Sequence, residues 1–355
     1  MTNKPQFVGE RVSFTAAFSE VSRGVKKFKR NQYVEYGAHP IVDQGQKLIA
    51  GYSDDETGLF NDVPAIVFGD HTRCVKYVEE PFFAGADGVK ILKPRLSDNA
   101  RFWWHELKAT PIENLGYSRH FKLLKAATFK NYDTASQTEI VARLDSILDQ
   151  IAQVNQQIEQ LDQLIKSRFV EMFGDLEHGY KCPSCELCSV AEVGSSKRVF
   201  KSELLSEGVP FYRGTEIADL SAGKPARPNL FISKEHYEKL IAATGRPEAG
   251  DLLLPSICPD GQIWCVNTDA PFYFKDGRVL WIRPNRDAID GVYLRHALST
   301  MFQMSFSSIA SGTTFAELKI FLLKGLNIPL PNLKTQKEFA AFVQQVDKLK
   351  YGGPS

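Results

Sequence analysis

The sequence predicts a mixed α/β (α+β) fold in which two similar globular domains alternate with two long coiled-coil helices. Three observations predict it: a heptad pattern in the middle of the chain, a shorter copy of that pattern near the C-terminal end, and matched segments before each helix. The 355 residues suffice for more than one hydrophobic core. We expect domains at 1–133 and 175–333, a central helix at 134–174 and a short helix at 334–351, with a pseudo-twofold relation between the copies.

Short apolar runs bounded by turn residues predict strands in both globular domains. Examples are residues 65–68 and 75–78 in the first domain, and 251–254 and 264–266 in the second. Long loops connect these runs, and loops are where recognition residues are most often found.

A narrow apolar seam marks the central helix. Ser136 with Glu139 has the spacing of a capping box and Gly174 is a stop signal, so we expect a helix over 136–172, roughly 50 Å long. Polar residues fill the gaps in the seam, as in a coiled coil, and a helix this long needs a partner helix. The seam residues follow steps of four and three: Ile140, Leu144, Ile147, Ile151, Val154, Ile158, Leu161 and Ile165.

An internal repeat supplies a candidate partner. Residues 81–94 align without a gap with 271–284, and residues 121–125 align with 320–324. Residues 136–139 then fall on 335–338, and Phe339, Val343 and Val346 continue the seam. A weaker match pairs Glu20-Val21 with Glu192-Val193. Because the second helix is short, we expect another subunit or a second copy of the chain to cover the seam beyond about Ile158.

Charge and composition narrow the function classes. The net charge is +1 overall, but +3 over residues 1–135, −4 over 136–175 and +2 over 176–355, so a nucleic-acid surface would consist of local patches. No basic start followed by an apolar run and no stretch of membrane-spanning length occurs, so we expect a cytoplasmic protein without a membrane partner. Six cysteines in this length do not make a disulfide scaffold.

Catalytic and metal-binding motifs are weak. Cys182, Cys185 and Cys188 could offer three thiolates to zinc, but no well-placed fourth ligand follows, so packed thiols are the favoured interpretation and no metal is assigned. Asp260 with Glu317 and Lys319 resembles the scattered carboxylates and lysine of a metal-dependent nuclease, which stays an alternative. No phosphate-binding glycine loop and no amino-methyltransferase tetrapeptide is present, so no catalytic residue is assigned.

Basic residues in turn-rich segments of both domains are the candidate DNA-binding residues. Lysine and arginine neutralise phosphates, and arginine or threonine at a loop tip can read base edges. The candidates are Lys26, Lys27, Lys29, Arg30, Lys47, His71, Arg73 and Lys76 in the first domain, and Lys197, Arg198, Lys201, Arg213, Thr215, Lys224 and Arg227 in the second.

The pattern as a whole resembles the specificity subunits of type I restriction-modification enzymes. The segments that carry the resemblance are 161–175, 328–336 and 40–52, and the duplicated order of domain and helix covers nearly the whole chain. Two features depart from the family pattern. The first copy has residues 129–133 at the position where the second copy has a proline-rich entry to its helix. The second helix is also short.

The resemblance implies a non-catalytic DNA-reading subunit of a defence system against foreign DNA. Each domain would be a target recognition domain for one half of a bipartite target in double-stranded DNA, with the helices packed antiparallel as a spacer. Methyltransferase subunits with S-adenosylmethionine, and restriction subunits with ATP and Mg²⁺, would assemble around a chain that has no cofactor of its own. Self-association through the uncovered helix is a further expectation. A coiled-coil adaptor whose domains bind proteins is the alternative.

Overall fold

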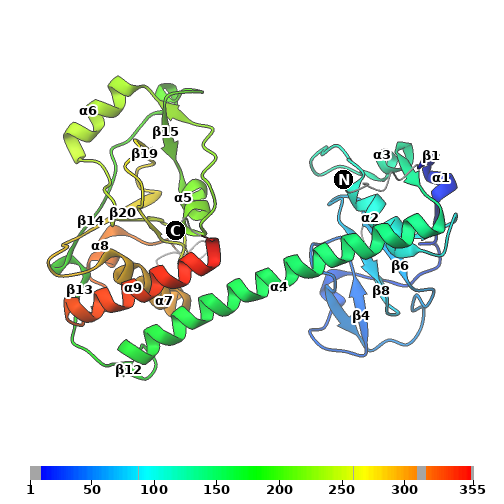
Figure 1. Ribbon diagram of the computed structural model, residues 1–355, viewed down its shortest axis with the longest axis horizontal. Coiled ribbons are helices and arrows are strands. Elements are labelled where there is room, and N and C mark those ends of the chain that lie inside the picture. The colour runs from blue at the N-terminus through cyan, green and yellow to red at the C-terminus, as the bar shows by residue number, and fades with distance from the viewer. Residues whose placement is uncertain (1–8, 87, 259, 310–316, 353–355) are drawn as a thin grey trace, which may run out of the picture. The chain divides into compact units, whose positions relative to one another are not determined.

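The computed structural model describes residues 9–86, 88–258, 260–309 and 317–352 (Figure 1). The chain divides into two compact units, Met1–Val154 (unit 1) and Asn155–Ser355 (unit 2). Each unit combines helices with a four-stranded sheet and a second sheet, which has four strands in unit 1 and three in unit 2. This confirms the predicted mixed fold. Within the described ranges, no helix is both long enough and apolar enough to cross a membrane.

Unit 1 is built on an antiparallel sheet with the order β2-β9-β6-β7. Successive side chains of a strand point to opposite faces, so Ile66 and Phe68 pack against a helical layer while Val67 packs toward the second sheet. The strands are β2 (Phe18–Glu20), β9 (Val89–Pro94), β6 (Ala65–Gly69) and β7 (Val75–Val78), and the helices are α1 (Phe14–Ala17), α2 (Ala100–Ala109) and α3 (Phe121–Ala126).

The second sheet of unit 1 has the order β3-β8-β4-β5, with β4 parallel to β8. Its strands are β3 (Lys27–Phe28), β8 (Phe83–Gly85), β4 (His39–Val42) and β5 (Gly51–Ser53), and the 3-10 helix η1 (Arg30–Gln32) follows β3. A separate pair, β1 (Glu10–Ser13) and β10 (Thr128–Asn131), lies before the long helix in the chain. Because β4 and β8 are parallel, their carboxyl ends meet at one edge of the sheet.

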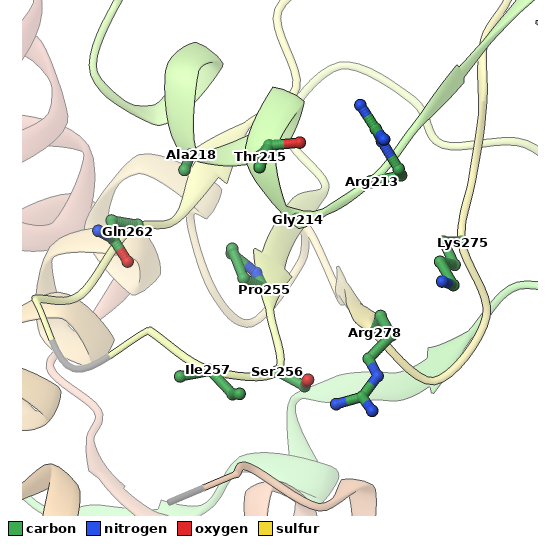
Figure 2. Close-up of a pocket in the computed structure, with 10 residues that line it drawn as sticks. All are labelled: Arg213, Gly214, Thr215, Ala218, Pro255, Ser256, Ile257, Gln262, Lys275 and Arg278. Carbon is green, nitrogen blue, oxygen red and sulfur yellow. The ribbon is translucent and has the colours of Figure 1, made fainter. Parts of the chain in front are cut away.

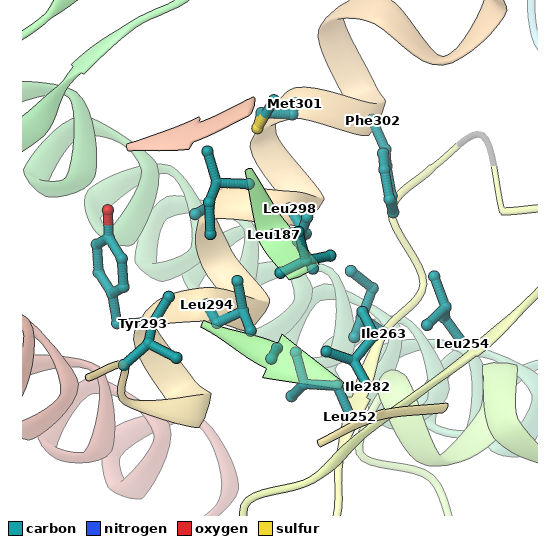
Figure 3. Packing of buried hydrophobic residues seen from close by; sticks show 14 of the residues in the cluster. Leu187, Leu252, Leu254, Ile263, Ile282, Tyr293, Leu294, Leu298, Met301 and Phe302 are labelled. Carbon is teal, nitrogen blue, oxygen red and sulfur yellow. The ribbon is translucent and has the colours of Figure 1, made fainter. Parts of the chain in front are cut away.

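Unit 2 repeats this plan. Its antiparallel sheet has the order β14-β20-β17-β18, and Leu252 and Leu254 face α7 while Leu253 faces the other side (Figure 3). A second sheet, β16-β15-β19, again contains a parallel pair, β15 with β19. The strands of these sheets are β14 (Ala191–Ser195), β20 (Val279–Pro284), β17 (Leu252–Pro255), β18 (Trp264–Cys265), β16 (Phe231–Ile232), β15 (Val209–Tyr212) and β19 (Tyr273–Phe274).

The other elements of unit 2 surround these two sheets. The strands β13 and β21 pair with each other, as do β11 and β12. The bounds are β11 (Gly174–Asp175), β12 (Gly179–Tyr180), β13 (Ser184–Glu186), β21 (Asn327–Pro329), η2 (Leu187–Ser189), η3 (Lys201–Glu203), α5 (Gly214–Ser221), α6 (Lys234–Thr244), α7 (Gly291–Ile309) and α8 (Ile320–Lys324).

The matched segments of the sequence form matching elements. Residues 81–94 contain β8 and β9, and residues 271–284 contain β19 and β20. The weaker match of Glu20 with Glu192 is wrong by one residue: Ser19 pairs with Lys93, and Glu192 pairs with Arg283, the residue equivalent to Lys93. Because Ser19 and Glu192 pair with equivalent residues, Glu192 corresponds to Ser19 and not to Glu20. The difference matters, since a shift of one residue places every side chain of a strand on the other face of the sheet.

The long helix α4 (Thr134–Phe173) begins at the first residue of the predicted segment 134–174, two residues before Ser136. Asp133, not Ser136, is the capping residue, because its carboxylate accepts hydrogen bonds from the Ser136 backbone N–H at 2.9 Å and from the Ser136 hydroxyl at 2.7 Å. Helix α9 (Leu333–Tyr351) is capped in the same way by Asn332, which accepts from the Thr335 backbone N–H at 3.0 Å. The repeat therefore extends to the capping residues.

Helix α9 packs on the C-terminal half of α4 within unit 2 (Figure 1). Phe339 near the start of α9 contacts Phe169 and Phe173 near the end of α4, and Lys350 near the end of α9 pairs with Asp162. The two helices are therefore antiparallel, as the resemblance implies.

This packing corrects the sequence-based expectation about the uncovered part of the seam. Leu161, Ile165, Phe169 and Phe173 of α4 pack in the core of unit 2, and the exposed seam residues are the earlier ones. The expectation of an uncovered seam beyond Ile158 is wrong because an antiparallel partner begins beside the end of α4. The exposed seam residues are Leu144, Ile147, Ile151 and Val154; Ile140, Ile158 and Leu161 are half-buried, and Ile165, Phe339, Val343 and Val346 are buried.

We expect the stability of unit 2 to depend on pH through His296 on α7. Its ring packs edge-on against Phe339 at 5.5 Å, and its Nε2 atom is buried without a hydrogen-bond partner among the described residues. Burial, with smaller contributions from Arg295 and Lys350, lowers the pKa of His296 well below its usual value. Since the unfolded chain takes up this proton below about pH 6.5, the free energy of unfolding should fall as the pH drops from there.

We expect His296→Phe to remove about one proton from this acid dependence, about 1.4 kcal/mol per pH unit. Urea unfolding of the full chain at pH 7.5 and 5.5 measures it. His105→Phe in unit 1 is the matched control, since burial also lowers the pKa of His105 and the two effects should add. Equal pH slopes for His296→Phe and wild type would contradict the prediction.

Candidate nucleic-acid interface

A hollow of about 510 Å³ opens in unit 2 at the carboxyl ends of the parallel strands β15 and β19. Figure 2 shows Arg213, Lys275 and Arg278 along one side of it and Gln262 on the other. Pro255 at the end of β17 lies between them. The hollow is thus lined by three cations and an amide, which are donors suited to phosphate oxygens and base edges.

Arg213, the first residue after β15, is held by Glu216 on the first turn of α5. The guanidinium donates from Nη2 to Oε1 at 2.8 Å and from Nε to Oε2 at 3.2 Å, while the Thr215 hydroxyl also donates to Oε2 at 3.0 Å. The Glu216 side chain is 6% exposed and that of Arg213 is 38% exposed. Burial raises the pKa of Glu216, but these hydrogen bonds outweigh it and the pKa is lowered.

A second carboxylate, that of Glu317, holds Arg278, which lies on the same side of the hollow as Arg213. Glu317 accepts a hydrogen bond from the Ser256 hydroxyl at 2.8 Å and forms ion pairs with Arg278 at 3.1 Å and Lys319 at 2.8 Å. Hydrogen bonds from Lys319 and then Ser256 lower the pKa of Glu317. The carboxylate that a nuclease would need for a metal is therefore engaged by two cations and a hydroxyl.

Unit 1 has its equivalent site at the carboxyl ends of β4 and β8. A hollow of about 230 Å³ is lined there by Arg30, Tyr33, Asp43 and Gln44, among others. The loop after β4 contacts the β6–β7 turn, because the Gln44 side chain accepts from the His71 backbone N–H at 3.1 Å and its carbonyl accepts from Thr72. In unit 1 the loop after a parallel strand therefore lies against a hairpin turn.

Several predicted DNA-binding residues lie at these two sites. Arg30 lines the unit 1 hollow, and Arg213 and Thr215 line the unit 2 hollow. The His71 ring stacks on the exposed Tyr117 at 4.9 Å. Arg73 donates to the Ile112 carbonyl at 3.0 Å and lines a neighbouring hollow.

The remaining predicted residues lie elsewhere or inside. Lys76 is buried, and its ammonium donates to the Asp43 carbonyl at 2.7 Å. Lys26 pairs with Asp55, and Arg198 lies 3.7 Å from Asp276. Exposed side chains that do not line either hollow are those of Lys27, Lys29, Lys47, Lys197, Lys201, Lys224 and Arg227.

Sequence reasoning missed Lys275, Arg278, Gln262 and Gln44. The signal for the first two was present, since both lie in the repeat segment 271–284, where the first copy has Gly85 and Gly88. Cations that replace glycines at the end of a repeated strand are candidates for a specialised site. Gln262 and Gln44 give no comparable signal.

The C-terminal part of the chain matches a family model. Residues 184–351 match the family model described as "Type I restriction modification DNA specificity domain". This part of the chain belongs to that family. The match spans both main sheets of unit 2, the residues that line the unit 2 hollow, and helix α9. A comparison with curated proteins finds no match.

The whole chain has the fold of a specificity subunit. A crystal structure of the type I restriction-modification system S subunit from M. genitalium is 15% identical with a TM-score of 0.55, covering 99% of this chain and 92% of that chain. An HsdS subunit from Thermoanaerobacter tengcongensis is 14% identical with a TM-score of 0.40, covering 99% and 93%. A structure described for complex assembly and conformational transition of the type I R-M system is 15% identical with a TM-score of 0.47, covering 95% and 92%.

The three cysteines of the C-x-x-C-x-x-C run are free thiols. Cys182 and Cys185 are half-buried and Cys188 is exposed. Burial raises the pKa of the Cys182 thiol. In the described ranges, no group of three histidine, cysteine, aspartate or glutamate side chains is placed to hold a metal ion.

Proposed function

We propose that this chain is the DNA-reading subunit of a type I restriction-modification enzyme. Its domains at 1–133 and 175–333 would be target recognition domains that each read one half of a bipartite target in double-stranded DNA. The observation that supports this most is the site built twice, at the carboxyl ends of β4 and β8 and of β15 and β19, with different side chains each time. The same fold with different side chains in each hollow is what two domains that read two different half-sites would need.

The chemistry would come from other subunits. Methyltransferase subunits would bring S-adenosylmethionine, and restriction subunits would bring ATP and Mg²⁺, while this chain would carry no catalytic residue and no cofactor. The exposed apolar residues Leu144, Ile147, Ile151 and Val154 on α4 support a docking role, since apolar side chains in a row on a surface are typical of an interface. A partner subunit or a second copy of this chain would cover them.

Methylome sequencing of a host that carries this chain with its methyltransferase subunit tests the proposal. We expect methylation at a single bipartite motif that is absent without this chain. In binding experiments on the same complex, log affinity should fall linearly with log salt concentration, with a slope of about −0.9 per phosphate contacted.

Two results would favour the other functions. If the complex fails to bind DNA at any salt concentration, a protein-binding adaptor is the better account. If the chain alone cleaves DNA in Mg²⁺ and Asp260→Ala abolishes the cleavage, the chain is a nuclease. Asp260 is exposed, so this substitution should not disturb folding.

A further inference from the structure

The two hollows contain one structurally equivalent position with opposite charge. In unit 1, Val42 of β4 pairs with Ala84 of β8, and Asp43 follows. In unit 2, Tyr212 of β15 pairs with Phe274 of β19, and Arg213 follows. Ala84 and Phe274 are equivalent in the repeat, so Asp43 and Arg213 both occupy the first position after the parallel strand.

Each of these residues is paired with a buried partner of opposite charge. The Asp43 carboxylate lies 3.5 Å from the ammonium of Lys76, whose side chain is 5% exposed. Arg213 is paired with Glu216, whose side chain is 6% exposed. In both pairs the strand-end residue is the more exposed member, at 25% for Asp43 and 38% for Arg213. Glu216 fixes the orientation of the Arg213 guanidinium through two hydrogen bonds, whereas Lys76 donates to the backbone carbonyl of Asp43 at 2.7 Å and so positions the residue that carries the carboxylate.

After these hydrogen bonds are made, Arg213 still has a free donor group and Asp43 still has a free acceptor atom. Glu216 takes the Nε and one Nη2 proton of Arg213, and Asn229 accepts from Nη2 at 3.1 Å on the exposed side. Nη1 has no partner in the part of the chain that the structure describes. In unit 1, the Gly45 backbone N–H donates to Oδ1 of Asp43 at 2.7 Å, and Oδ2 accepts no hydrogen bond from the described residues.

These remaining groups match different bases. The Nη1 group of Arg213 can donate to O6 or N7 of guanine, whereas the free Oδ2 atom of Asp43 can accept from the N4 amino group of cytosine. An aspartate near DNA is repelled by phosphates unless a cation compensates it, and Lys76 does so here. The two residues occupy an equivalent position beside the two hollows with inverted charge, and this points to recognition more than to folding.

We propose that Arg213 and Asp43 are equivalent specificity-determining residues of opposite character, with Glu216 and Lys76 as their positioning residues. Arg213 reads a guanine in the half-site of unit 2, and Asp43 reads a cytosine in the half-site of unit 1. This inference rests on the proposed function and adds to it the base-pair class that each unit requires at this position.

The test uses the complex with the methyltransferase subunit and synthetic duplexes of the methylome-derived target, each changed at one base pair. Arg213→Ala should weaken binding to the unchanged target about 5- to 150-fold. A duplex changed at one particular guanine of one half-site should be bound equally by Arg213→Ala and wild type. Asp43→Ala should behave in the same way at one cytosine of the other half-site.

Further variants separate base reading from simple charge and from misfolding. Arg213→Lys keeps the charge and should still lose discrimination at the same base pair. Glu216→Gln should reduce discrimination there too, and should add nothing to Arg213→Ala. The matched control is Glu235→Gln, which removes a carboxylate from the exposed pair with Lys239 on α6 and should change no preference.

A uniform loss of affinity over all duplexes, with the salt slope reduced by about one, would mean that Arg213 contacts a phosphate and would overturn the inference. Unchanged preference in Arg213→Lys and Glu216→Gln would overturn it as well. A wild-type complex without any preferred target would overturn the proposed function and this inference with it.

Discussion

Deleting residues 151–157 from α4 is expected to shorten the gap between the two half-sites of the DNA target by about three base pairs. Seven helical residues span about 10 Å, and DNA rises 3.4 Å per base pair. One heptad corresponds to nearly two full turns, so the deletion turns the units by only about 20°. All residues of 151–157 are exposed, so neither core loses a contact.

Methylome sequencing of the deletion variant with its methyltransferase subunit gives the new motif directly. The control is deletion of 151–155, which shortens the helix almost as much but turns one unit by about 140° relative to the other. We expect that variant to methylate no bipartite motif. The same gap in wild type and the heptad deletion would show that α4 does not set the spacing.

The sequence was sufficient for the elements that local patterns encode. The heptad seam and the repeat located α4 and α9, and the capping error was small because the capping residues stand only three residues before the predicted ones. The polar signal was there: Asp133 and Asn332 stand at the same offset as the predicted capping residues. The heptad pattern gave a wrong prediction only for the part of α4 that stays uncovered, because heptads alone do not show which ends of two helices meet.

The candidate site was harder to predict because long-range contacts decide which charges are free. Lys76 looked like a surface cation, yet it shares a strand face with the buried Val78 and reaches the Asp43 carbonyl from a strand 33 residues away. Glu216 showed no sign in the sequence of holding Arg213. Basic residues in turn-rich segments predicted a nucleic-acid surface, and the structure brings Arg213, Lys275 and Arg278 together at one hollow.

Replacing Phe339 with alanine is expected to destabilise unit 2 by about 3–5 kcal/mol. The ring is fully buried and meets Phe169 and Phe173 edge-on, each at 5.5 Å, and Tyr293 at 6.4 Å. It is therefore the contact at which α9, α7 and the end of α4 meet. Urea unfolding of the full chain, followed by far-UV circular dichroism, measures the loss.

Two variants on α9 separate this packing from an effect on helix propensity. Leu349→Ala changes a residue that is 73% exposed on the same helix and should shift the free energy of unfolding by less than about 0.5 kcal/mol. Phe339→Leu retains apolar volume and should cost less than Phe339→Ala. If Phe339→Ala unfolds like wild type, α9 does not hold α4 in solution. The heptad deletion would then change the target gap less than the helix rise predicts, since a loosely held α4 could not transmit its length.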